Sequence, residues 1–124
     1  MEGSSILEEV RKAVGLEQDD TSFDSELKLH VNSALATLNQ NGVGRPTIVN
    51  DVSVTWADLK DPLQLVGNEV FEQVKLFVFL KTKILFDPPP PSNIPYVAEA
   101  TNEVLWRLRE AYTSYEEDDV WITT

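Results

Sequence analysis

The residues of this chain that could carry out chemistry are few, and each candidate set lacks a part. His30 is the only histidine, and the chain has no cysteine. A histidine-ligated zinc site or a serine–histidine–aspartate triad would therefore depend on His30 alone. We interpret His30 as an ordinary structural or surface residue of a helix, and we predict no catalytic residue, no cofactor site and no metal site.

Two loops contain patterns that resemble binding motifs without completing them. Gly42-Val43-Gly44 follows an expected helix rather than a strand and lacks the Lys-Ser/Thr of a phosphate-binding loop, so it reads as a helix stop. Asp19, Asp20, Asp24 and Glu26 could crowd around a calcium ion, but the central glycine and closing glutamate of an EF-hand are missing. We expect a solvated acidic loop there.

The length and charge of the chain exclude further classes of function. The 124 residues fit one domain, and 21 acidic against 10 basic side chains give a formal net charge of -11. Neither half of the chain is basic, so a protein that grips nucleic-acid phosphates is not expected. The start of the chain does not read as a signal peptide, and no apolar run approaches the ~20 residues that a membrane span needs. The lack of cysteine fits a reducing cytoplasm.

The first half of the chain predicts two amphipathic helices that share one core. Apolar residues at 6, 7, 10 and 14 follow Ser4 or Ser5 as an N-cap and precede Gly15 as a stop. A second helix is expected from about Asp24 to Asn41-Gly42, with an apolar face made of Leu27, Val31, Ala34, Leu35 and Leu38.

The middle of the chain breaks this pattern. Residues 43–55 contain short β-prone runs around Asn50-Asp51, so we expect a protruding loop or a short β-hairpin there. The spacing of Thr55 and Asp58 resembles a capping box, which predicts a brief helix that stops near Asp61-Pro62.

The second half predicts two longer helices. From about Asn68 to Phe86 runs a stripe of apolar residues wide enough for contact on two sides, and the four prolines 88–91 end it. A last helix is expected from Asn93 or Ile94 to about Tyr115. The fold class is therefore all-α, a bundle of about four helices over residues 1–115. Residues 116–124 are expected to form an extended C-terminal tail.

The order of these elements and their amino-acid sequences resemble the phage head-tail connector (adaptor, or head completion) family. The resemblance rests on Ile6 to Leu16, on Asp19 to Asp24, on His30 to Gly44, and then on Trp56. It continues with Val74 to Lys81, with Leu85-Phe86-Asp87-Pro88-Pro89 and with Leu105-Trp106-Arg107-Leu108. The longer proline run and the Glu-Glu-Asp-Asp tail depart from the family pattern.

This resemblance implies a non-enzymatic structural subunit without a cofactor. Such a subunit forms a ring with copies of itself, dodecameric to match the portal, and joins the portal protein to a downstream connector, stopper or tail protein. DNA passes through the ring without sequence-specific binding, and no membrane is involved. The expected location is the head–tail interface of the virion, after assembly in the cytoplasm of the bacterial host.

A set of interface residues follows from the wide apolar helix, from the breaks in pattern and from the resemblance. We expect contacts with partner proteins at Trp56, Phe71, Phe79, Lys81, Trp121 and Ile122. In the tail, Trp121 is the expected anchor of a short run that pairs with a partner's sheet edge.

Two alternatives stay open at this stage. Asp24-Ser25 resembles the modified serine of an acyl-carrier-like protein, although Ser22 and Glu26 stand where that family usually has a glycine and an apolar residue. The high acidity also fits an inhibitor that mimics DNA, but the apolar helix of residues 68–86 does not favour that reading.

Overall fold

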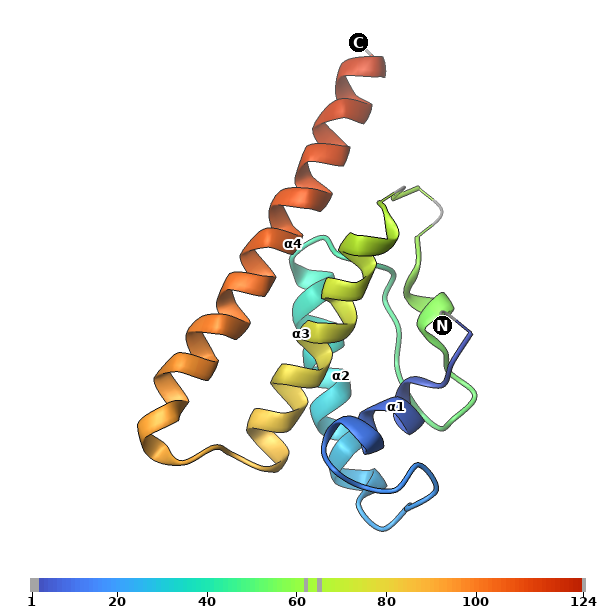
Figure 1. The fold of residues 1–124 in the computed structure, drawn as a ribbon. Coiled ribbons are helices and arrows are strands. Elements are labelled where there is room, and N and C mark those ends of the chain that lie inside the picture. Colours follow the sequence, from blue (N-terminus) through green and yellow to red (C-terminus); the bar gives the residue numbers. More distant parts are fainter. Residues whose placement is uncertain (1–2, 62, 65, 124) are drawn as a thin grey trace.

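The chain folds into four α-helices arranged around α3. The computed structural model describes residues 3–61, 63, 64 and 66–123, with only the helical backbone described from 114 to 123. The helices are α1 (Ile6–Ala13), α2 (Asp24–Gln40), α3 (Asn68–Phe86) and α4 (Ile94–Thr123), with short 3₁₀ turns η1 (Trp56–Leu59) and η2 (Pro91–Asn93). Figure 1 shows α4 along one edge of the molecule and α1 with the N-terminal segment along the other. The expected all-α bundle is confirmed.

Helix α3 holds the core together because it packs against all three other helices. Its buried face includes Phe71, Val74, Phe77 and Val78. The five residues predicted for the inner face of α2 are all buried against it, as are Val104, Leu108 and Tyr112 of α4. The apolar spacing along each helix therefore locates the core correctly.

Local signals set the ends of α1. The Ser5 hydroxyl oxygen accepts a hydrogen bond from the Glu8 backbone N–H at 3.3 Å, which satisfies one of the free donors of the first turn. Gly15 follows the last turn with a φ of 93°, a conformation that favours glycine. The residues before α1 are also fixed, because Ser5 pairs with Thr55 in an isolated antiparallel bridge.

The sequence predicts either a protruding loop or a short β-hairpin for residues 43–55. They form a loop, since no strand occurs among the described residues. Val43 and Val49 are buried. The backbone of Val49 bonds to the side chain of Asn32 on α2, donating to Oδ1 at 2.8 Å and accepting from Nδ2 at 3.1 Å. Because Asn32 satisfies this backbone, the segment needs no partner strand.

The proline run separates α3 from α4 as the sequence predicts, but α4 is longer than expected. The sequence predicts a helix end near Tyr115 and an extended tail, whereas the backbone of α4 stays helical to Thr123. Once a helix exists, each added residue gains a hydrogen bond without a new nucleation cost. The acidic run 116–119 also contains two glutamates, which favour helix more than β-branched residues do.

Candidate interaction surfaces

The residues considered for catalysis lie apart from one another. His30 is half-buried on α2, and its Nε2 lies 3.4 Å from a carboxylate oxygen of Glu26 one turn earlier. No group of three or more side chains suited to hold a metal ion occurs within the part of the chain that the structure describes. Ser25, the carrier-like serine, is exposed in the first turn of α2.

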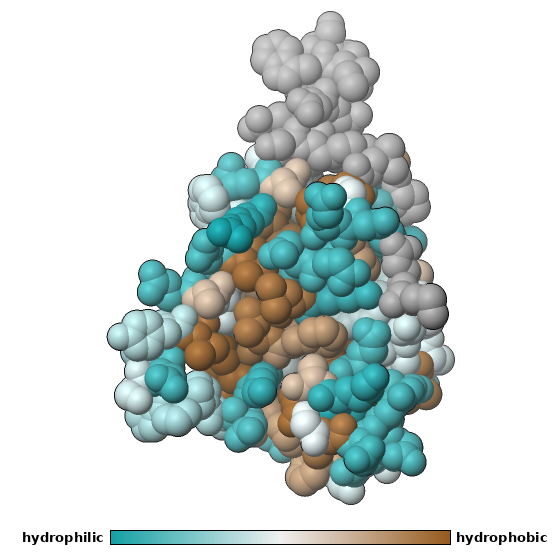
Figure 2. Space-filling view, in the orientation of Figure 1, coloured by the Kyte–Doolittle hydropathy of each residue, from teal (hydrophilic) through white to brown (hydrophobic). Residues whose placement is uncertain are grey.

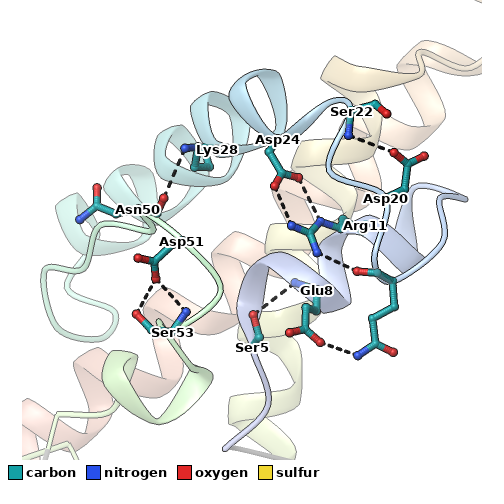
Figure 3. A network of polar contacts seen from close by, with 11 residues as sticks. Ser5, Glu8, Arg11, Asp20, Ser22, Asp24, Lys28, Asn50, Asp51 and Ser53 are labelled. Carbon is teal, nitrogen blue, oxygen red and sulfur yellow. Dashed lines mark hydrogen bonds and ion pairs between the residues drawn. The ribbon is translucent and has the colours of Figure 1, made fainter.

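A buried arginine joins α1, the acidic loop and α2 (Figure 3). Arg11 is 3 % exposed. Its Nε and Nη2 donate to the two carboxylate oxygens of Asp24 at 3.0 and 2.6 Å, and its Nη1 donates to the backbone oxygen of Gln18 at 2.7 Å. The hydrogen bond to Asp24 raises the pKa of Arg11 above its usual value. Asp24 therefore has a structural partner, which accounts for the Asp-Ser pair without a carrier function.

Two other acidic turns are stabilised by hydrogen bonds between an aspartate and a serine two residues later. The carboxylate of Asp20 accepts the backbone N–H of Ser22 at 3.0 Å, and Asp51 accepts both the hydroxyl and the backbone N–H of Ser53, at 2.5 and 2.8 Å (Figure 3). These hydrogen bonds lower the pKa of Asp20 and Asp51. Short-range turns of this kind account for the acidic loops without a bound cation.

Trp56 lies inside the molecule, although its place beside a break in pattern suggested a partner contact. Its side chain is fully buried. The indole Nε1 donates to a carboxylate oxygen of Glu9 at 3.1 Å, and the ring meets Phe79 edge-on with centroids 5.7 Å apart. The Lys75 ammonium lies 5.6 Å from the Trp56 ring centroid. Trp56 thus fixes η1 against α1 and α3.

The remaining predicted interface residues are distributed over the bundle. Phe71 is buried under Lys60, whose ammonium lies 4.9 Å from the ring centroid. Phe79 and Lys81 are half-buried on α3. The side chains of Trp121 and Ile122 lie outside the described residues. A contact with another protein stays a prediction for all six, and the burial of Trp56 and Phe71 does not favour it for these two.

Apolar side chains nevertheless reach the surface on two helices. Figure 2 shows them gathered along α3 on the face in view. Of the residues of α3, Leu76 is exposed, and Phe79 and Leu80 are half-buried. On α4, Trp106 is 59 % exposed. Its position two residues from both Val104 and Leu108 places Trp106 on the opposite side of the helix.

The arrangement therefore offers surfaces for protein partners and no assembled reaction centre among the described residues. The sequence pattern of one family, described as phage connector protein, matches residues 6–115. The chain belongs to the phage connector proteins. The match spans α1, α2, α3 and the described side chains of α4, so it covers the whole bundle. No curated protein and no solved structure matches the chain.

Membership assigns this connector protein a structural role in head–tail connection and makes it a component of the phage virion. The phage connector proteins are not an enzyme family. None of the helices in the described parts of the connector is long and apolar enough to cross a membrane.

Proposed function

We propose that this connector protein assembles into a dodecameric ring between the portal and the next connector, stopper or tail protein. The observation that carries the proposal is the family match across the whole bundle, from residue 6 to residue 115. The exposed Leu76 of α3 and Trp106 of α4 support it, since both are apolar side chains that a neighbouring subunit could cover. The subunit assembles in the cytoplasm of the host before it joins the virion.

The direct test is imaging of purified virions, or of purified portal mixed with this protein. A symmetric ring of additional density beneath the portal is expected, and light scattering of the free chain shows whether that ring preexists or is templated. Symmetric averaging that finds the portal followed directly by another protein would exclude the proposed location.

The proposed ring would enclose a channel through which the DNA passes. With a formal charge of -11, copies around the DNA path present more acid than base, and the duplex passes without adhering because phosphate contacts require cationic side chains. The lumen therefore favours passage over binding.

We propose that residues 116–124 attach the subunit to the portal; the backbone of 116–123 belongs to α4. Along the described side chains of α4, the last buried residue is Tyr112. Trp121 and Ile122 are the proposed anchors, carried on a helical extension in place of the added strand that the sequence suggested. Because a binding anchor is dispensable for the fold of the bundle, deletion of residues 117–124 is expected to leave the melting temperature unchanged and to abolish binding to purified portal.

The Trp121→Ala, Ile122→Ala double variant, which keeps the length of the chain, is expected to lose portal attachment as the truncation does. A truncated subunit that still attaches would contradict the assignment of the tail, and one that unfolds would show that the segment belongs to the bundle.

A further inference from the structure

Trp106 is an exposed tryptophan of α4. It is 59 % exposed in the middle of the helix, while Val104 and Leu108 on either side of it are buried. Arg109 is exposed one turn later, and one turn earlier Glu103 accepts a hydrogen bond from Arg107 at 2.5 Å. Tryptophan and arginine are the residues that most often dominate protein interfaces.

The opposite edge of the molecule contains a hollow of about 770 Å³ between α1, the N-terminal segment and α3. Its apolar lining comes from Ala13, Val52 and Phe79, and its polar lining includes Glu8, Glu9 and Lys12. The carboxylates are held in place, because Glu8 accepts a hydrogen bond from the Gln18 amide and Glu9 accepts one from the Trp56 indole. Both carboxylates of the hollow thus have partners within the subunit.

We propose that the outer face of α4 of one copy, with Trp106 at its centre, inserts into this hollow on the next copy. Both surfaces carry charges of each sign: Arg109 and Glu103 are exposed near Trp106, and Glu8, Glu9 and Lys12 line the hollow, so each surface offers partners for the other. The indole covers Val52 and Phe79, and burial of an aromatic side chain removes about 150–250 Å² from water.

The two surfaces lie on opposite edges of the subunit (Figure 1), so the contact joins copies head to tail. A contact between two different surfaces produces a closed ring when the rotation between copies closes. This inference rests on the proposed ring and names the surfaces that form it.

Substitution of Trp106 by alanine tests the inserted side. The Trp106→Ala variant is expected to keep the melting temperature of the parent chain, since the side chain is mostly exposed, and to lose more than tenfold in incorporation into particles. Tyr96→Ala is the matched control, because Tyr96 is an exposed aromatic residue of the same helix, 72 % exposed, and lies a full ten residues earlier. Tyr96→Ala is expected to assemble as the parent does.

Cysteine pairs test the geometry, and the chain has no cysteine to interfere. Asn102, one turn before Trp106, and Gly3 at the hollow are both exposed, and a Cβ added at Gly3 meets no atom within 4 Å. Treatment of the Asn102→Cys, Gly3→Cys double variant with a short bis-maleimide is expected to give a ladder of linked subunits. An equimolar mixture of the two single variants is expected to stop at dimers, and neither single variant alone is expected to link.

The outcomes of these experiments distinguish a failure of the proposed contact from a failure of the proposed ring. A ladder on the purified chain without a ring beneath the portal supports the contact and overturns the proposed location. If the ring incorporates Trp106→Ala as efficiently as the parent chain, the proposed contact is wrong but the ring stands. The same holds if the double variant gives no ladder. Linkage of the Asn102→Cys single variant to itself also overturns the contact, because that product requires a symmetric contact.

Discussion

Arg11 and Asp24 are the residues on which the N-terminal half of the bundle depends most. Removal of the carboxylate by Asp24→Ala leaves a guanidinium that is 3 % exposed without its charged partner. Loss of one member of a buried ion pair costs roughly 3–5 kcal/mol, and we expect the lower end of that range because Asp24 itself retains some contact with solvent. The measurement is the free energy of unfolding in urea at neutral pH.

Glu17→Ala is the matched control for Asp24→Ala, since Glu17 lies in the same loop and is exposed. It is expected to change the free energy of unfolding by no more than about 0.5 kcal/mol. Equal losses for the two variants would mean that general acidity, and not the Arg11 contact, sets the stability of this region.

Tyr112 makes the stability of the bundle depend on pH at the alkaline end. Burial raises the pKa of its phenol above the ordinary value of 10.0. The unfolded chain therefore loses this proton at a lower pH than the folded chain does. The contribution of Tyr112 is constant below about pH 10, and it falls as the pH rises above that value, by up to about 1.4 kcal/mol per pH unit.

The Tyr112→Phe variant is expected to remove this part of the decline. Urea unfolding between pH 8 and pH 11 measures it, with Tyr96→Phe as the control because Tyr96 is exposed. Parallel pH profiles for Tyr112→Phe and the parent chain would disprove the role of the buried phenol.

At the scale of elements, the long loop of residues 43–55 depends on Asn32. Asn32→Ala removes the side-chain amide on α2 that bonds to the backbone N–H and to the carbonyl of buried Val49. An unpaired buried backbone group costs about 1–3 kcal/mol, so we expect a loss of about 2 kcal/mol and faster hydrogen exchange at the Val49 amide. Asn50→Ala, which changes an exposed side chain of the same loop, is expected to alter neither. Unchanged exchange at Val49 in Asn32→Ala would contradict this account.

The helices could be predicted from the sequence because local signals and burial agree in them. The expected bounds of residues 68–86 coincide with α3, whose wide apolar stripe packs against three helices and whose end is set by the prolines. Ser5 and Gly15 likewise mark α1 from both sides. Each signal acts within one turn of the residue that carries it.

Other features depend on contacts between distant residues, which a local pattern does not contain. The place of Trp56 depends on Glu9, 47 residues earlier, and on Phe79. The hollow on the α1 edge is likewise built from residues 3 to 79. The length of α4 is a different case: the acidic run and the β-prone end suggested a break that helix propagation overrides.

At the scale of the whole molecule, the charge predicts behaviour towards DNA. With a formal charge of -11 and no basic half, the connector is expected to show no binding to a duplex at about 150 mM salt, even at roughly tens of micromolar protein. Fluorescence anisotropy of a labelled duplex measures this, with a basic DNA-binding protein as positive control. Saturable binding under these conditions would contradict the proposed passive channel.

The pairing of Ser5 with Thr55 also bears on the order in which the molecule acquires its structure during synthesis. The hydrogen bonds from Ile6 N–H to the Val54 carbonyl and from Trp56 N–H to the Ser4 carbonyl join the first residues to a segment made about fifty residues later. The surface that α1 covers on α3 does not exist until residue 86 has left the ribosome. Because contacts that distant in sequence close late, the emerging N-terminal half has no complete core of its own. The backbone amides of α1 are therefore expected to gain protection from hydrogen exchange together with those of α3 and not before them.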